Sequence, residues 1–366
     1  MNEKIKIIYI VNSFVLGGAE NMLLHLCRAI NKEKFEIFVC SVNGGGILAS
    51  EFEKIGIKPK IFKKKSKIGL SVIWEIYKFI KEVKPQIVHT HLFAADFWGK
   101  IAAILAGVPV IVTTEHSVNL DENWLKQKIK WFLSFFTDKI VAVSNGVRYY
   151  YIQKVKINKD KFEVIYNGVN LNTFAFKVYK PLDLTKKINA VIVARLKEVK
   201  GHKYLLEAMP LIIKKYPNFI LNIVGGGDLG LELKELVNKL GLVNNVNFLG
   251  ERLDIEKIFP DMDIFILPSL WEGLGIVLLE AQASGLAVLT SNIPGTIEVV
   301  KNEQTGLLFE TKNSQAIFNC VDNLLSHPDL HKKIVENAYE QVKEKFSLEK
   351  MVGSYEQLYF DLLKTK

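Results

Sequence analysis

Cysteine is scarce in this sequence, and no two cysteines have the spacing of a metal-binding or disulfide-bonded pair. The 366 residues contain only Cys27, Cys40 and Cys320. Zinc ribbons and disulfide scaffolds need cysteines that are closely spaced or even in number, so the sequence argues against both classes. We therefore expect a reducing compartment and place the protein in the cytoplasm.

Long apolar runs are missing too. The apolar run Ile5 to Val11 is short, follows charged residues and lacks a small-residue cleavage site, so we expect no secretory signal. No stretch of the sequence approaches the roughly 18 uncharged apolar residues of a membrane-spanning helix. Repeats and low-complexity tracts are also absent from the sequence. We expect a folded chain that can touch a membrane surface but does not cross it.

The sequence has an ordinary globular composition but an uneven charge. Hydrophobic residues make up 49% and charged residues 24%, which excludes disordered and collagen-like chains. Lys and Arg number 48 against 39 Asp and Glu, a net charge of +9. Residues 1–180 hold 27 basic and 15 acidic residues (27 − 15 = +12), whereas residues 181–366 hold 21 and 24 (21 − 24 = −3). The first half therefore suits an acidic partner such as phosphate, nucleic acid or an anionic membrane.

Length and hydrophobic pattern predict two α/β domains. At about 150 residues per domain, the chain is long enough for two cores. Short β-branched runs alternate with amphipathic stretches, which is typical of parallel strands joined by helices. In the first half we predict strands at residues 5–11, 35–42, 87–90, 110–114 and 140–143. In the second half we predict strands at residues 188–194, 219–224, 246–249, 264–267 and 287–289, with helices at 202–215 and 229–240.

The alternation is interrupted from Asn167 to Lys187, a stretch rich in Asn, Gly and Lys. This interruption sets the predicted domain boundaries. We predict a first domain over residues 1–170, a linker over 171–187 and a second domain over 188–347. A helix over 348–366 is then free to pack back on the first domain. The expected fold class is α/β, with two Rossmann-like doubly wound domains facing an interdomain cleft.

Unusual residues follow the predicted strands of the first domain, at the sheet edge where open parallel sheets bind ligands. Gly17 and Gly18 precede a helix, so backbone N–H groups can approach an anion there, although a tight turn would also explain them. His116 follows the strand at 110–114, which predicts an imidazole at the mouth of the cleft. A structural histidine is the alternative.

In the second domain, two cations five residues apart, Arg195 and Lys200, follow the first predicted strand. Beside a helix start they form a natural clamp for a diphosphate, with solvated surface charge as the alternative. After the next strand, Gly225 to Gly230 satisfies G-x-G-x-x-G, the dinucleotide fingerprint. This motif does not open its domain and contains its own acidic residue, Asp228, so a dehydrogenase ranks low.

The segment Pro268 to Ala281 is the most informative. Glu272 lies on a glycine-rich loop, and Glu280, eight positions later, lies inside the predicted helix. Backbone amides at the helix start add hydrogen-bond donors beside Glu272. An exposed helix residue is the alternative for Glu280. Its neighbours Leu278, Leu279 and Ala281 are apolar, however, and a buried carboxylate needs a partner such as the two hydroxyls of a ribose.

These segments, in this order and spacing, resemble the retaining glycosyltransferases of family 4, which adopt the two-domain GT-B fold. The resemblance spans nearly the whole chain. It also includes the segments Val143-Ser144-Asn145 and Ile165-Tyr166-Asn167-Gly168-Val169. One departure is Asn170, where the family usually has Asp.

The resemblance implies a retaining transferase that takes a sugar from a UDP- or GDP-sugar and needs neither a metal nor a cofactor. Arg195 and Lys200 would hold the diphosphate, with the amides of Gly17 and Gly18 closing over it. Glu280 would bind the ribose. Of the implied catalytic residues Arg195, Lys200, His116 and Glu272, the last two would lie at the donor sugar. The other implied donor-binding residues are Gly225, Gly250, Arg252, Gly273, Leu274, Gly275 and Ile276.

Two further motifs have metal-binding spacing, but we expect no metal at either. Asp261 and Asp263 form a D-x-D that directly precedes a buried strand, where a capping or turn role is favoured. His89 and His91 form an H-x-H at a strand end, without an evident third ligand.

We expect the acceptor to meet the first domain, where the positive charge lies. One cluster comprises Lys58, Lys60, Lys63, Lys64, Lys65 and Lys67. The segment Trp124 to Phe136 mixes lysines with aromatic residues, as would a helix lying on an anionic bilayer, and a core helix with a solvated lysine edge is an equal alternative. We favour a peripheral enzyme on the inner face of the cell membrane, with a saccharide or lipid-linked acceptor, in cell-surface polysaccharide or glycan assembly.

Two other functions stay open at this point. A nucleic-acid-binding protein would explain the basic first half, but no recognition motif accompanies the basic residues, so nucleic acid is not an expected partner. A nucleotide-sugar epimerase of the same architecture would share the donor site. It would differ by converting the donor in the absence of an acceptor.

Overall fold

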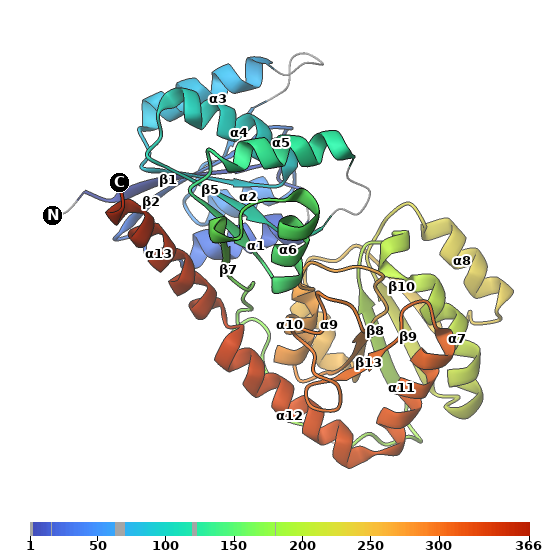
Figure 1. The fold of residues 1–366 in the computed structure, drawn as a ribbon. Helices are drawn as coiled ribbons and strands as arrows, with labels where there is room; N and C mark the ends of the chain where they lie inside the picture. The colour runs from blue at the N-terminus through green and yellow to red at the C-terminus, as the bar shows by residue number, and fades with distance from the viewer. Residues whose placement is uncertain (1–2, 16, 63–69, 119–122, 180) are drawn as a thin grey trace. The chain divides into compact units, whose positions relative to one another are not determined.

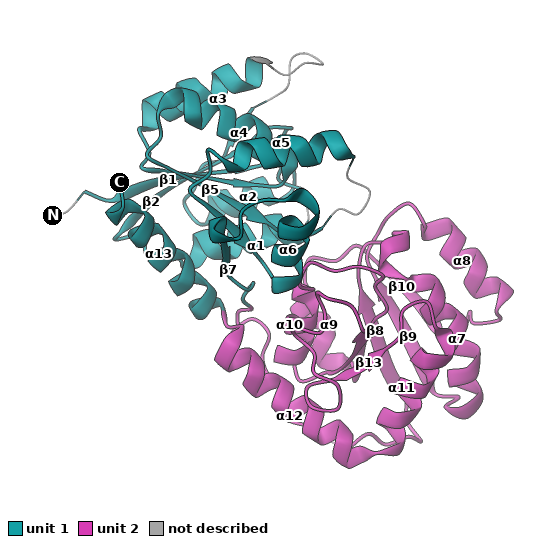
Figure 2. Cartoon of the chain, in the orientation of Figure 1, with its two compact units in different colours: residues 1–168, 348–366 teal, residues 169–347 magenta. Residues whose placement is uncertain are grey.

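The chain forms two compact units, each built on its own parallel sheet (Figures 1 and 2). The computed structural model describes residues 3–15, 17–62, 70–118, 123–179 and 181–366. Unit 1 comprises Met1–Gly168 and Leu348–Lys366, and unit 2 comprises Val169–Ser347. Residues 171–187, expected as a linker, lie in unit 2, where Phe176, Tyr179 and Leu182 pack against the core.

Unit 1 contains a seven-stranded sheet in the order β3-β2-β1-β4-β5-β6-β7, and all its strand pairs are parallel. The strands are β1 (Ile5–Val11), β2 (Phe35–Ser41), β3 (Lys60–Ile61), β4 (Ile87–His91), β5 (Val110–Glu115), β6 (Lys139–Ala142) and β7 (Phe162–Val164). The helices are α1 (Gly18–Ala29), α2 (Leu48–Lys54), α3 (Leu70–Val83), α4 (Phe93–Ala106), α5 (Trp124–Ser134), α6 (Asn145–Tyr150), η1 (Tyr151–Val155), η2 (Lys159–Lys161) and α13 (Leu348–Lys364).

Helices cover both faces of this sheet (Figure 1). Alternate residues of β1 point to opposite faces, so Ile8 and Ile10 pack with α3 and α4, whereas Ile7 and Tyr9 pack with α1, α2 and α13. The C-terminal helix α13 thus completes the core of unit 1, a position that its sequence had left open.

Unit 2 contains a six-stranded parallel sheet in the order β10-β9-β8-β11-β12-β13. Its strands are β8 (Ile188–Val193), β9 (Phe219–Val224), β10 (Val246–Gly250), β11 (Ile264–Leu267), β12 (Ala287–Ser291) and β13 (Leu307–Phe309). Its helices are η3 (Glu198–Lys200), α7 (His202–Lys215), α8 (Gly230–Lys239), α9 (Ile255–Ile258), η4 (Phe259–Asp261), α10 (Ile276–Ala283), α11 (Ser314–Ser326) and α12 (Pro328–Lys345). Both strand orders are those of doubly wound folds, so the predicted fold class is confirmed.

The ten predicted strands are present, and three short ones were not predicted. These are β3, β7 and β13, with two, three and three residues. Runs this short contain too few residues for alternation to be visible, and all three lie at or beside a sheet edge. In the described part of the chain, no helix combines the length and the hydropathy that a bilayer-spanning segment needs.

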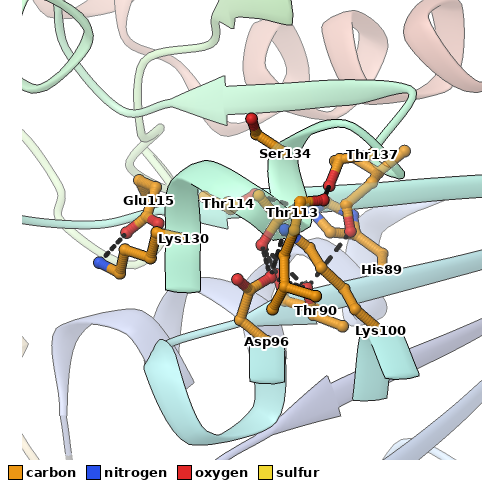
Figure 3. A network of polar contacts seen from close by, with 12 residues as sticks. His89, Thr90, Asp96, Lys100, Thr113, Thr114, Glu115, Lys130, Ser134 and Thr137 are labelled. Atoms are coloured by element: carbon orange, nitrogen blue, oxygen red, sulfur yellow. Dashed lines mark hydrogen bonds and ion pairs between the residues drawn. The ribbon is translucent and has the colours of Figure 1, made fainter. Parts of the chain in front are cut away.

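An ion pair lies inside unit 1, between Asp96 and Lys100 of α4. Lys100 Nζ is 2.8 Å from Asp96 Oδ1, and the two side chains are almost fully buried. The hydroxyls of Thr90 and Thr113 donate to the same oxygen at 2.7 and 2.6 Å (Figure 3). The carboxylate thus connects α4 to β4 and β5. Its hydrogen bonds compensate the burial of charge only while every partner is present.

Removing one member of this pair therefore tests the packing of unit 1. We expect Asp96→Ala to lower the free energy of unfolding by about 3–5 kcal/mol, because the Lys100 ammonium would stay buried without its partner. Urea denaturation followed by circular dichroism measures the loss. Asp96→Ala combined with Lys100→Met should recover most of it. The control Glu51→Ala removes the exposed Glu51–Lys54 pair, and we expect it to cost less than about 1 kcal/mol; an equally small loss for Asp96→Ala would contradict the prediction.

Candidate functional site

The carboxyl ends of four neighbouring strands in unit 2 carry most of the residues that the sequence singles out. The strands β10, β9, β8 and β11 are adjacent and parallel, so the loops that follow them meet at one edge of the sheet. Arg195 and Lys200 follow β8, and Gly225 follows β9. Gly250 and Arg252 end and follow β10, and Glu272 follows β11. The site described below lies at this edge.

The loop after β8 packs directly against the loop after β11. The amide of Leu270 donates to the Val199 carbonyl at 2.8 Å. Gly201 has φ = 67°, and a Cβ there would collide with the Pro268 carbonyl oxygen, so the close approach of the two backbones requires glycine. This contact places Lys200 beside Glu272.

Lys200 and Glu272 form an ion pair. Lys200 Nζ lies 2.7 Å from Glu272 Oε1, and the side chains are 19% and 9% exposed. The hydroxyl of Ser269, which is buried, donates to the same carboxylate oxygen at 2.6 Å. Two predicted catalytic residues therefore touch each other. Ser269 is a further member of this group that the sequence analysis did not single out, although it lies only three positions before Glu272.

Arg195 differs from Lys200 in its surroundings. It is exposed, and no described residue forms a hydrogen bond or ion pair with its guanidinium. A cation in this state is available to an anionic ligand. Lys197, two residues further on, is also exposed and lies 3.9 Å from Asp228.

The glycine-rich turn after β9 supports the Arg195 loop. Gly225 (φ 139°) and Gly227 (φ 146°) approach it so closely that a Cβ would collide with the carbonyl oxygens of Ala194 and Leu196. The amide of Leu196 also donates to the Gly226 carbonyl at 2.8 Å. The glycines of the G-x-G-x-x-G pattern thus have a packing role against the neighbouring loop, which explains them without a dinucleotide.

The segment that ends β10 joins the same cluster. The Gly225 amide donates to the Gly250 carbonyl at 2.8 Å. The guanidinium of Arg252, which we expected to bind the donor, instead donates two hydrogen bonds to the Asp254 carboxylate, both 2.8 Å. This pairing lowers the pKa of Asp254 to about 2. The observed contact of this segment with the glycine-rich turn is therefore through the Gly250 backbone, and the Arg252 side chain is paired within its own loop.

Helix α10 begins at this edge. Gly275 is its N-cap, with φ = 78°, and the helix starts at Ile276. The first N–H groups of a helix have no partner within the helix, and the helix dipole makes this end favourable for oxygen atoms that carry negative charge. Gly273, Leu274 and Gly275 form the loop between Glu272 and the first helical residue, Ile276.

Glu280 lies in α10 and is half-buried. No described residue forms a hydrogen bond or ion pair with its carboxylate, which is unusual for an acid in such a place. Burial raises the pKa of Glu280 to about 7, and the charge of Glu256 adds to this shift. Near neutral pH the group is therefore divided between its charged and neutral forms. A half-buried carboxylate that no described residue binds has the open acceptor positions that the predicted ribose contact needs.

His202 is a buried residue that the sequence analysis overlooked. It begins α7 next to Lys200, and neither ring nitrogen has a hydrogen-bond partner in the described part of the structure. Burial and the nearby Lys200 charge lower the pKa of His202 to about 4, so the ring is neutral at physiological pH. Its position directly after Lys200 and Gly201 was the available signal.

The remaining predicted site residues belong to unit 1. Gly17 is the N-cap of α1, and Gly18 begins the helix. His116 Nε2 lies 2.9 Å from His91 Nδ1, and burial lowers the pKa of His116 to about 3. The ring of His91 stacks on that of His89, with 4.4 Å between centroids. His116 is thus a neutral imidazole held by a second one.

The two motifs with metal-binding spacing have structural contacts. Asp263 Oδ2 accepts a hydrogen bond from the Asn189 amide at 2.8 Å, so this acid joins β11 to β8. His89 bonds Tyr359 at 2.7 Å and Thr114 at 2.8 Å, which connects β4 to α13 and β5. Within the described residues, no group of three or more His, Cys, Asp or Glu side chains is arranged to hold a metal ion.

Two family models match the chain in succession. The family described as Glycosyltransferase Family 4 matches residues 16–173, and the family described as Glycosyl transferases group 1 matches residues 177–341. Together these matches take in the predicted site residues of both units and every strand except β1.

Individual relatives match over the full length. UDP-Gal:alpha-D-GlcNAc-diphosphoundecaprenol alpha-1,3-galactosyltransferase of Escherichia coli is 30% identical, with 100% of this chain and 99% of the relative covered. The crystal structure of a glycosyltransferase from Rickettsia africae has a TM-score of 0.85 at 28% identity, over 99% of this chain and 100% of that one. Anabaena HepE in complex with UDP-glucose has a TM-score of 0.87 at 21% identity, over 97% and 99%, and shows a shared fold. The chain therefore belongs to glycosyltransferase family 4 and is a glycosyltransferase with the GT-B fold.

Proposed function

We propose that this glycosyltransferase moves a hexosyl group from a UDP- or GDP-sugar to a saccharide or lipid-linked acceptor, in the assembly of a cell-surface polysaccharide or glycan. The observation that carries the proposal is Glu280, a half-buried carboxylate of α10 without a partner in the described structure, with Glu272 in the loop that leads into the same helix. The name of the Escherichia coli relative supports a UDP-sugar donor and an acceptor linked to a polyprenyl diphosphate. The complex of Anabaena HepE with UDP-glucose supports the same donor class.

Each part of the donor has a complementary group at the edge of unit 2. The ribose hydroxyls would donate to the Glu280 carboxylate, which satisfies the acid and replaces the water it loses on burial. The diphosphate would lie against Arg195 and Lys200, whose charges it complements. Backbone near Gly225 and Gly250 would frame the base.

Glu272 changes partner in this proposal. Without donor it binds Lys200 and Ser269. When the diphosphate draws Lys200 toward itself, Glu272 becomes free to accept hydrogen bonds from the sugar hydroxyls, beside the amides at the start of α10. Before the donor binds, the ion pair therefore keeps the Lys200 ammonium and the Glu272 carboxylate in position.

The transfer step needs no metal in this scheme. The acceptor oxygen forms a bond to the anomeric carbon on the face from which the bond to the phosphate oxygen breaks, and the acceptor proton passes to the departing phosphate. The configuration at the anomeric carbon is thus retained. Negative charge grows on the diphosphate as the bond breaks, so Arg195 and Lys200 stabilise the transition state more than the ground state.

The roles proposed for unit 1 rest on the family resemblance. Gly17 and Gly18 would offer backbone amides to the diphosphate, and His116 would lie beside the donor sugar. The uncharged state of His116 suits hydrogen bonding to a sugar hydroxyl, because a neutral imidazole has one donor and one acceptor nitrogen. We place the enzyme in the cytoplasm, peripheral to the inner face of the cell membrane.

A thermal-shift panel tests the donor class and the absence of a metal requirement. We expect UDP- or GDP-sugars to raise the melting temperature, and ADP-sugars or free sugars to leave it nearly unchanged, because stabilisation follows binding to the folded state. The rise should be equal with magnesium and with EDTA. A rise that depends on magnesium would contradict the metal-free scheme, and no rise with any nucleotide sugar would contradict the donor site.

Alanine substitutions test the cationic pair. Arg195→Ala and Lys200→Ala should each lower kcat/KM at least tenfold, about 1.4 kcal/mol of transition-state stabilisation, measured by release of the nucleoside diphosphate. Lys197→Ala is the matched control, since Lys197 is an exposed cation of the same loop and has no role in the scheme. Near-normal rates in both Arg195→Ala and Lys200→Ala would rule out the clamp.

The pKa of Glu280 predicts how donor binding depends on pH. Below a pKa of about 7 the group is protonated and loses its charge, so the affinity for the nucleotide sugar should rise about tenfold from pH 6 to pH 8. Isothermal titration calorimetry across this range measures it. Glu280→Gln should bind weakly and without this pH dependence, whereas Glu256→Gln should move the midpoint to lower pH because it removes the charge that raises the pKa. An affinity in the unsubstituted protein that stays constant from pH 6 to pH 8 would refute the ribose contact.

A further inference from the structure

Large aromatic side chains gather on the surface of unit 1, along α5 and the two residues that follow it. They are Trp124, Trp131, Phe132, Phe135 and Phe136, and together with Leu125 their exposed fractions range from 42% to 66%. Trp131 packs edge-on against Phe135, with 4.9 Å between ring centroids, and Phe132 against Phe136 at 5.5 Å. A core helix with only its lysines in solvent is therefore excluded. Apolar exposure on this scale marks an interaction surface.

The opposite side of α5 is fixed to the rest of unit 1. Lys130 is buried, and its ammonium donates to Glu115 at 3.3 Å (Figure 3). It also donates to the Tyr151 hydroxyl at 2.6 Å. Leu133 and Ser134 are buried on the same side. These contacts set the rotation of the helix about its axis, so the aromatic side faces outward in the folded unit.

A groove runs between α5 and the π-helical turn η1. Its volume is about 580 Å³, and it is lined by Trp124, Gln127, Lys128, Trp131, Phe132, Lys154, Val155 and Lys156. Three of these residues are lysines, and none of the described lining residues is acidic. Lys128 also lies over the ring of Trp124, with 4.7 Å from its ammonium to the ring centroid. The surface thus joins apolar rings to positive charge.

We propose that this aromatic and lysine surface docks unit 1 on an anionic lipid bilayer, with lipid phosphates at Lys128, Lys154 and Lys156. Indole and lysine side chains suit the boundary between headgroups and acyl chains, where rings enter the apolar layer and ammonium groups stay at the phosphates. Each lysine near an anionic surface strengthens binding about fivefold, and the groove supplies three.

This inference rests on the proposed function in one respect: a bilayer is where an acceptor with a lipid anchor would be found. It also goes further, because it names the surface and the lipid chemistry that brings the enzyme there. Lys63, Lys64, Lys65 and Lys67 of the lysine cluster predicted near residue 60 lie outside the described residues.

Vesicle sedimentation of the full chain tests the surface. The probes are vesicles of phosphatidylcholine alone and of phosphatidylcholine with phosphatidylglycerol. We expect binding only to the second kind, with a blue shift of tryptophan fluorescence. Lys128→Glu with Lys154→Glu should weaken this binding at least tenfold, and Trp131→Ala with Phe132→Ala should weaken it and reduce the blue shift. The matched control, Lys214→Glu with Lys239→Glu, reverses two exposed lysines of unit 2 and should bind vesicles as the unsubstituted chain does.

Three results would overturn the proposal. They are equal binding to both kinds of vesicle, undiminished binding by the charge-reversed variant, and a dimer in light scattering that the Trp131 and Phe132 substitutions dissociate. Stabilisation by nucleotide sugar, measured on each variant, separates this proposal from the previous one. If the donor stabilises the unsubstituted chain but that chain binds neither kind of vesicle, the docking surface is wrong and the donor site stands.

Discussion

The contact between Lys200 and Glu272 sets the geometry of one edge of unit 2, where the loops after β8 and β11 meet. These residues are 72 positions apart in the sequence, and they meet because β8 and β11 are adjacent and parallel, so that their following loops leave the sheet at the same edge. A partly buried ion pair adds little net stability, since removing two charges from water offsets most of their attraction. Its effect is on position, because it keeps the Lys200 ammonium and the Glu272 carboxylate together in the loops before α10.

Close backbone contacts make this arrangement possible, and glycine makes the contacts possible. Gly201 admits the Pro268 carbonyl, and Gly225 admits that of Ala194. Each glycine has a positive φ and faces a neighbouring loop, so a side chain would push the loops apart as well as strain the backbone. The glycine-rich turn after β9 therefore supports the loop that carries Arg195 through backbone contacts.

Two buried polar groups of unit 1 differ from Glu280 of unit 2 in their hydrogen-bond partners. In unit 1, Asp96 has three partners, and His89 has two, so these groups stabilise the fold. In unit 2, Glu280 is half-buried with no partner among the described residues, and its pKa shows the cost of that position. A carboxylate in such a place lowers stability unless a ligand completes its hydrogen bonds, which is the reason that Glu280 rather than Asp96 is the candidate for ligand binding.

Local patterns in the sequence were sufficient for the main strands, for the helices at the site and for the family. Alternating β-branched runs, glycines before helices and the spacing of Glu272 and Glu280 depend on neighbouring residues, so they can be read directly. Tertiary structure alone decided the rest: the pairing of Lys200 with Glu272, the influence of Glu256 on Glu280, the packing of α13 on unit 1 and the outward aromatic side of α5. Each of these depends on which distant segments become neighbours, and no local pattern records that.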